Sequence, residues 1–78
     1  DSAARRVPSE ILLRSAFGMT HAEATLAAAL CRGTSLGDFA AERGISIHTV
    51  RTQLRALLSK TRTDRQADLV GMLSGLAF

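Results

Sequence analysis

The fold is decided by residues 44–61, whose sequence is GISIHTVRTQLRALLSKT. Gly44 can adopt the left-handed conformation that ends a helix, and Ser46 is a favoured N-cap for the next one. From residue 47 to about residue 61 the apolar side chains recur with the period of an α-helix. They place one apolar face along it, made of Val50, Leu54, Leu57 and Leu58. The stretch therefore predicts a helix over 47–61, joined to the preceding element by a turn of about three residues.

The polar face of this helix is basic. It carries His48, Arg51, Thr52, Arg55 and Arg62. An ordinary solvated helix intersperses Glu with Lys or Arg, yet residues 46–63 contain no acidic residue. Residues 43–65 hold six Lys or Arg and one Asp, a net charge of +5, whereas 1–42 and 66–78 each carry −1. A positive excess confined to one segment is typical of a surface that binds a polyanion, and the alternative is a solvated face that happens to be basic.

The rest of the chain also predicts helices. Valine and isoleucine are too scattered for alternating strands, so the expected class is all-α. We expect a four-helix bundle that contains a helix-turn-helix, with helices over about 20–31, 36–43, 47–61 and 64–76. A further N-terminal helix is expected over about 9–16, after Pro8 and before Gly18.

Capping residues support these boundaries. Thr20 and Glu23 have the spacing of a capping box, and so do Thr63 and Gln66. Ser35 is placed as the N-cap of the short helix over 36–43. Gly33 is expected to close the helix over 20–31.

Length and composition exclude several classes of protein. At 78 residues the chain can form one small domain, with 1–18 as a linker or helix from an upstream domain and 19–78 as the functional domain. Cys31 is the only cysteine, so no disulfide can form, and with two histidines it cannot make a structural zinc site. We expect no metal and no cofactor. The absence of an apolar run of about 20 residues and of a signal peptide predicts a cytoplasmic protein without membrane contact.

No constellation typical of an enzyme is present. The sequence has no paired carboxylates, no glycine-rich phosphate loop and no nucleophile with a positioned base. The protein is therefore predicted not to be an enzyme.

Small residues recur along the last predicted helix. Ala67, Gly71 and Gly75 lie four residues apart, a stripe that would let another helix backbone approach closely. Each glycine costs about 0.8–1 kcal/mol of helix stability relative to alanine, so helix packing, in the core or across a dimer, is expected to use them. The alternative is that Gly75 ends the helix and Gly71 is tolerated.

An ordered set of short motifs resembles the LuxR (GerE-like) family of bacterial regulator output domains. The motifs are Met19-Thr20-His21-Ala22-Glu23, Phe39-Ala40, Gly44-Ile45-Ser46, Thr49-Val50-Arg51 and Lys60. The match spans residues 19 to about 73. It implies four helices, the second and third forming a helix-turn-helix that binds double-stranded DNA, and the fourth often mediating dimerisation.

The resemblance also implies roles for individual residues. Ser46 and Thr49 would contact phosphate, Arg51, Thr52 and Arg55 would face the major groove, and Lys60 would lie near backbone phosphates. Either arginine could bind guanine through two hydrogen bonds, or contact phosphate only. His48 is equally placed for a groove contact and for a plain surface position.

The chain departs from the family pattern at three points. Gln53 stands where the family very often has His, although Gln can still donate to a phosphate oxygen. Phe39 replaces the usual Ile, and Thr61-Arg62 replaces Leu-Gly, which leaves the turn into the fourth helix open. We expect a homodimer on DNA through the fourth helix, with RNA polymerase as a further candidate partner. The alternatives are a promoter-binding domain like region 4 of a sigma factor and a helical protein-interaction module with a basic face.

Overall fold

The computed structural model describes residues 7–76, which form helices and contain no strand. The helices are α1 (Glu10–Phe17), α2 (His21–Cys31), α3 (Leu36–Arg43), α4 (Ile47–Thr61) and α5 (Gln66–Leu76). The predicted all-α class is confirmed. The expected extra helix at the N-terminus is present as α1. The start of α5 lies two residues later than predicted, and every other helix boundary lies within one residue of its predicted position.

Serine and threonine caps begin four of the helices. Ser9 Oγ accepts from Leu12 N at 3.1 Å, and Ser35 Oγ accepts from Asp38 N at 3.0 Å. Thr20 forms the full capping box, in which its hydroxyl accepts from Glu23 N while the Glu23 carboxylate accepts from Thr20 N. These bonds satisfy backbone N–H groups that the first turn of a helix leaves without partners.

Residues in the left-handed region end or follow the helices. Gly18, Gly33 and Gly44 have φ values of 68°, 91° and 65°, which glycine adopts without steric cost. Arg62, at the C-cap of α4, has φ 56° and is the one non-glycine residue with positive φ in the described part of the chain. The turn into α5 is therefore made by an arginine in a conformation that glycine adopts more readily.

The predicted capping box at Thr63 and Gln66 is wrong. The Thr63 hydroxyl pairs instead with the hydroxyl of Thr61 at 2.9 Å, and Thr61 is itself buried. The helix begins at Gln66, and the first carbonyl to accept a helical bond is that of Arg65, from Leu69 N at 3.0 Å. The hydroxyl that the sequence pattern assigned to the cap thus bonds to a side chain of the preceding turn and to no backbone N–H of α5.

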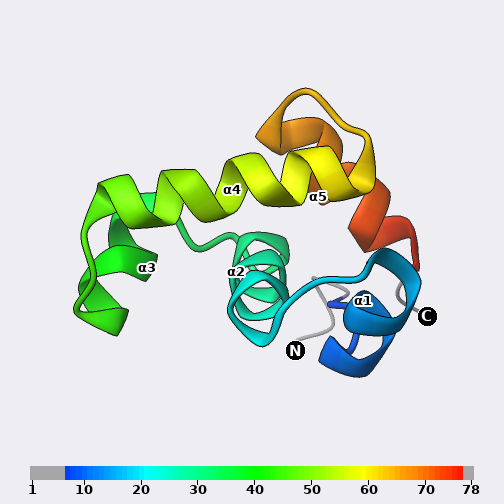
Figure 1. The fold of residues 1–78 in the computed structure, drawn as a ribbon, viewed down its shortest axis with the longest axis horizontal. Helices are drawn as coiled ribbons and strands as arrows, with labels where there is room; N and C mark the ends of the chain where they lie inside the picture. The colour runs from blue at the N-terminus through cyan, green and yellow to red at the C-terminus, as the bar shows by residue number, and fades with distance from the viewer. Residues whose placement is uncertain (1–6, 77–78) are drawn as a thin grey trace.

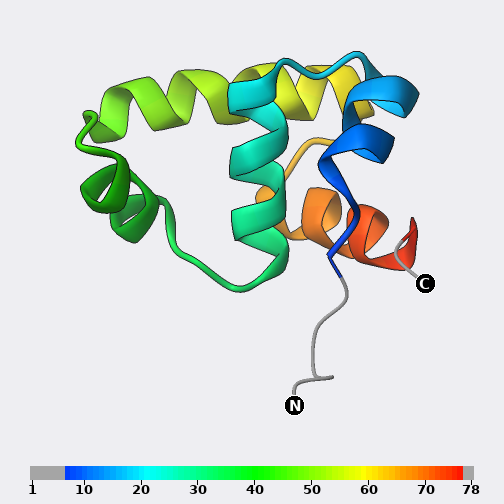
Figure 2. The ribbon, with the colours of Figure 1, turned by 90° about the horizontal axis from the view of Figure 1, so that it is seen from below.

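Helix α2 lies at the centre of the molecule. It passes beneath the middle of α4 and crosses it, with α3 under the N-terminal end of α4 and α1 and α5 near its C-terminal end (Figures 1 and 2). The core consists mainly of alanine from α2 and of leucine from every helix except α3. Its fully buried members include Leu13, Ala24, Leu26, Ala27, Val50, Leu57, Leu69 and Leu73. None of the helices in residues 7–76 is long and apolar enough to cross a membrane.

Candidate functional site

Helix α4 is presented at a corner. Gly44 ends α3, and Ile45 N donates to the Ala40 carbonyl at 3.1 Å, which closes the last turn of that helix. Ser46 then caps α4, its Oγ accepting from Thr49 N at 3.0 Å. Only residues 44–46 separate the two helices, as the sequence predicts. The short connection fixes the direction in which α4 leaves α3.

One face of α4 is buried against the other helices. Val50 and Leu57 are 0% exposed, and Leu54 and Leu58 are partly buried against the core. This is the apolar face that the sequence predicts. The rotation of α4 about its own axis is therefore fixed, and with it the set of side chains that faces solvent.

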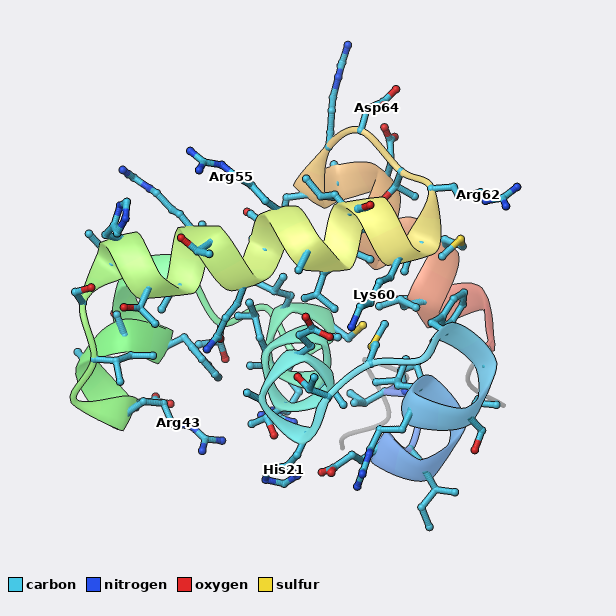
Figure 3. The ribbon with its side chains drawn as sticks, in the orientation of Figure 1. His21, Arg43, Arg55, Lys60, Arg62 and Asp64 are labelled. Atoms are coloured by element: carbon cyan, nitrogen blue, oxygen red, sulfur yellow. The ribbon has the colours of Figure 1, made fainter. Side chains whose placement is uncertain are left out.

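The opposite face carries His48, Arg51, Thr52 and Arg55, which we call the cationic ridge; all four are exposed. Arg55 extends away from the side of α4 on which α2 lies (Figure 3). Arg51 and Arg55 are one helical turn apart, about 6 Å along the axis. The Thr52 hydroxyl donates to the His48 carbonyl at 3.1 Å, so its oxygen keeps accepting capacity toward solvent.

The arginines of the ridge form no ion pair with any residue of the described range 7–76. The ion pairs among residues 7–76 are Arg14–Glu10, His21–Glu10 and Lys60–Glu23, and none involves the ridge. The first acidic residue that follows the ridge in the sequence is Asp64, which lies in the turn between α4 and α5. The ridge consequently offers guanidinium donors that are open to an external anion.

Ser46 and Thr49 lie at the N-terminal end of the same helix. Both are exposed, and their hydroxyl oxygens are 3.0 Å apart. Backbone N–H groups and the helix dipole favour negative charge at a helix N-terminus. The structure therefore brings six of the eight residues predicted to bind DNA to the solvent side and N-terminal end of α4: Ser46, His48, Thr49, Arg51, Thr52 and Arg55.

Lys60 is placed differently from the ridge. Its side chain turns toward α1 and α2, on the other side of α4 from Arg55 (Figure 3). The ammonium donates to Glu23 Oε1 at 2.6 Å and to the Gly18 carbonyl at 3.1 Å. Burial of Glu23 raises its pKa, but the Lys60 and Thr20 hydrogen bonds outweigh burial and the net pKa is lowered. The structure gives Lys60 partners within the chain and does not bring it to the ridge.

Gln53 also lies off the ridge. Its side chain is half-buried, and Oε1 is buried without a hydrogen-bond partner. It lines a hollow of about 230 Å³ between α2, α3 and α4. Neither its burial nor the contact of Lys60 with Glu23 follows from the charge pattern that singled out the ridge, because both depend on how α2 packs under α4.

The stripe of small residues on α5 faces solvent. Ala67, Gly71 and Gly75 are exposed, and a Cβ built on either glycine would meet no atom within 4 Å. The interpretation that these glycines admit another helix within the core is therefore wrong, because the buried face of α5 carries Leu69 and Leu73 instead. The stripe remains open to a partner outside the chain.

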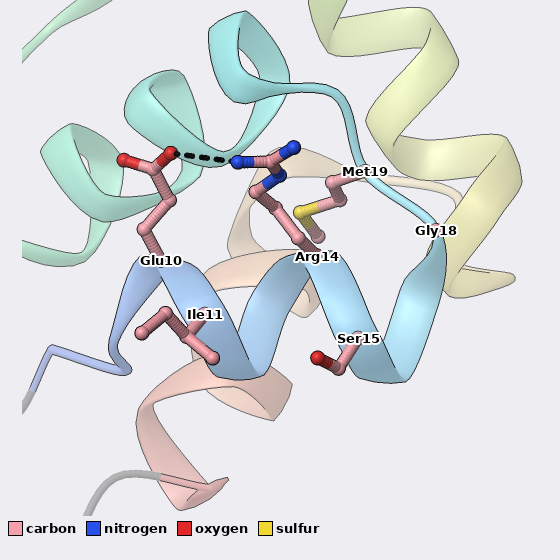
Figure 4. A pocket seen from close by; sticks show the side chains of 6 residues that line it. All are labelled: Glu10, Ile11, Arg14, Ser15, Gly18 and Met19. Atoms are coloured by element: carbon pink, nitrogen blue, oxygen red, sulfur yellow. Dashed lines mark ion pairs between the residues drawn. The ribbon is translucent and has the colours of Figure 1, made fainter.

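A second hollow, of about 400 Å³, lies over α1 (Figure 4). Gly18 and Met19 line it together with Glu10 and Arg14 of α1, and Arg14 Nη1 lies 3.7 Å from Glu10 Oε2. Ile11, also in its lining, is 79% exposed. The two charged residues that line this hollow, Glu10 and Arg14, are already paired with each other, so the hollow offers no unpaired charge to a ligand.

Sequence reasoning missed Arg43. Its guanidinium carbon lies 5.2 Å from the centre of the Phe39 ring, over the ring face. The signal in the sequence that could have found this contact is the position of Arg43 four residues after Phe39.

Within residues 7–76 no group of three or more His, Cys, Asp or Glu side chains is arranged to hold a metal. Comparisons of the chain with protein-family models, curated proteins and solved structures find no match.

Proposed function

We propose that this protein binds double-stranded DNA through the cationic ridge of α4, as the output domain of a bacterial transcriptional regulator of the LuxR type. The observation that carries the proposal is an exposed helix face with two arginines one turn apart and no acidic residue from Ser46 to Thr63. An α-helix is about 10–12 Å across with its side chains, which matches a major groove about 12 Å wide.

Each part of α4 then has a role on the duplex. Arg51 and Arg55 reach base edges, where a two-pronged contact with guanine gives about 1–3 kcal/mol of discrimination. Ser46 and Thr49 hold a phosphate at the N-terminus of α4. α3 and α4, joined by residues 44–46, act as the helix-turn-helix. Binding of this kind needs no catalytic group, no metal and no cofactor.

The small-residue stripe of α5 supplies the dimer contact on a twofold-symmetric site. One domain contacts few bases, so useful affinity comes from pairing two copies. Replacing Gly71 by Leu tests this, because the side chain enters solvent and leaves the fold intact. Sedimentation equilibrium on DNA-bound protein should show weaker pairing for Gly71→Leu, and unchanged association would refute this dimer contact.

DNA titration at several salt concentrations tests the main proposal. The logarithm of the association constant should fall linearly with the logarithm of salt, with a slope of about −0.9 per phosphate contact. Arg51→Gln and Arg55→Gln should weaken binding and either flatten this slope or reduce discrimination between duplexes. Arg65→Gln, which removes the same charge outside the ridge, is the control.

Equal effects of the three substitutions would contradict the proposal, because a diffuse positive charge would then account for binding. A shallow salt dependence would favour a protein-interaction module with a basic face. DNA binding that is seen only in the presence of RNA polymerase would favour the alternative that resembles sigma-factor region 4.

A further inference from the structure

Thr52 gives its only hydroxyl proton to the backbone of α4. Its Oγ1 donates to the carbonyl of His48, one turn earlier in the helix, at 3.1 Å. A threonine hydroxyl has one proton and two lone pairs, so with the proton engaged it can still accept a hydrogen bond but has none left to donate. The side chain is exposed on the cationic ridge. Toward a ligand on this face, Thr52 therefore presents a hydrogen-bond acceptor.

The neighbours of Thr52 on the ridge have different hydrogen-bonding chemistry. Arg51 and Arg55 carry guanidinium groups, which donate hydrogen bonds and cannot accept them. The imidazole of His48 donates or accepts according to its protonation and tautomer. Arg55 follows Thr52 by three residues, so the two side chains are neighbours on the helix surface. Of the four ridge residues, Thr52 is thus the one whose role the structure fixes as that of an acceptor.

The major groove of DNA offers few partners to an acceptor. Its hydrogen-bond donors are the exocyclic amino groups of adenine and cytosine, whereas the groove atoms of guanine, the O4 of thymine and the N7 of adenine all accept. A phosphate oxygen also only accepts, so a phosphate contact would need the proton that Thr52 gives to the His48 carbonyl. The direction of this one hydrogen bond therefore favours a base amino group over a phosphate.

We propose that Thr52 selects an adenine or a cytosine in the major groove by accepting a hydrogen bond from its exocyclic amino group. This inference rests on the proposed binding of DNA through the ridge, and it names the base chemistry that this part of the ridge reads. Thr52 lies in the N-terminal half of α4, the part of a recognition helix that contacts base edges. Guanine or thymine at the same position would place a carbonyl oxygen against the Thr52 oxygen and leave both without a donor.

The test begins with selection of duplexes from a randomised DNA library, by the unmodified protein and by three variants, followed by sequencing of the bound duplexes. Thr52→Val removes the hydroxyl and keeps the shape of the side chain, whereas Thr52→Ser keeps the hydroxyl. Thr25→Val is the matched control, because Thr25 makes the same kind of bond to the His21 carbonyl on α2, off the ridge. The unmodified protein, Thr52→Ser and Thr25→Val should enrich adenine or cytosine at one position. Thr52→Val should lose the enrichment at this position alone.

A duplex from which the amino group is deleted gives the second measurement. In the selected duplex the adenine is replaced by purine, or the cytosine by 2-pyrimidinone, which removes only the exocyclic amino group. The unmodified protein should bind this duplex about two- to tenfold more weakly than the parent duplex, the effect of one hydrogen bond. Thr52→Val should bind the two duplexes with equal affinity, which separates loss of the contact from any change in the DNA itself.

Three results would overturn the proposal: enrichment of guanine or thymine at the position that depends on Thr52, preferences that Thr52→Val leaves unchanged, or equal losses of the two proteins on the amino-deleted duplex. Each of them leaves specific DNA binding in place and so refutes the role of Thr52 alone. Failure of the unmodified protein to bind any duplex at low salt would refute the proposed function, and this inference with it. Thr52 is exposed, so its replacement leaves the core untouched.

Discussion

Lys60 Nζ lies 2.6 Å from Glu23 Oε1 and joins residues 37 positions apart in sequence. The same ammonium donates to the carbonyl of Gly18, the left-handed residue that ends α1, and the same carboxylate accepts the backbone N–H of Thr20. One ion pair therefore links the end of α1, the start of α2 and the last turn of α4. It is partly shielded from water, since the Glu23 side chain is 11% exposed and that of Lys60 33%.

Removal of either partner should destabilise the domain by about 1–2 kcal/mol, because the remaining charge loses its hydrogen bond in a partly buried position. Glu23→Gln, Lys60→Met and the double variant form a cycle that isolates the pair. We expect a coupling free energy of about 1 kcal/mol in urea unfolding followed by circular dichroism. Additive effects would show that the contact contributes nothing beyond its separate parts.

Stability should depend on pH through Glu23. Its pKa is lower in the folded protein, so its contribution is complete above the ordinary glutamate pKa of about 4.3 and is lost as pH falls through the lowered value. Unfolding between pH 7 and pH 3 should therefore show an acid-side loss that Glu23→Gln reduces. Glu42→Gln, which removes an exposed carboxylate, is the matched control, and its stability should still fall at low pH as that of the unmodified protein does.

Arg62→Gly should stabilise the protein. A non-glycine residue in the left-handed region costs about 1–2 kcal/mol of folding free energy, which Arg62→Gly would remove. Glycine also has greater conformational freedom in the unfolded chain, and this offsets about 0.5–1 kcal/mol of that gain. A net gain of up to about 1.5 kcal/mol is expected in urea unfolding. Arg62→Ala removes the same charge but keeps the Cβ, so it should bring no gain; equal gains would point to charge rather than backbone strain.

Gln53→Met should also stabilise the domain, by about 1 kcal/mol, because it replaces an amide whose oxygen is buried and unpaired with an apolar group of similar length. Thermal and urea unfolding measure the effect. Gln66→Met is the natural control, since Gln66 is likewise half-buried but has no buried unpaired atom. Loss of stability in Gln53→Met would mean that the amide already has a partner.

The helix boundaries were predictable because the signals that set them are local. Ser9, Ser35 and Ser46 each bond to a backbone N–H three residues on, a contact that sequence spacing alone encodes. Thr63 has the same spacing and failed, because the hydroxyl of Thr61 competes for it after α4 has turned. The spacing of a cap therefore predicts the bond correctly at Ser9, Ser35 and Ser46 but not at Thr63.

The candidate site was predictable to the extent that helical periodicity defines it. Val50 and Leu57 fix the inner face of α4, and Arg51 and Arg55 consequently point outward. Positions on the flanks of the helix were not predictable in this way. Lys60 is turned inward by Glu23, which is distant in sequence, so its contact depends on tertiary packing.

Alanine at the centre of the fold has a consequence for how α4 is oriented. Ala24 and Ala27 of α2 are 0% exposed, and α2 is the helix on which α4 rests. Adding even one methyl group at a fully buried position usually forces neighbouring side chains or backbone to move, and α4 is among the neighbours of α2. The orientation of the cationic ridge thus depends on two of the smallest apolar side chains in the core, and substitutions at Ala24 or Ala27 are expected to change that orientation where substitutions on the exposed face of α4 are not.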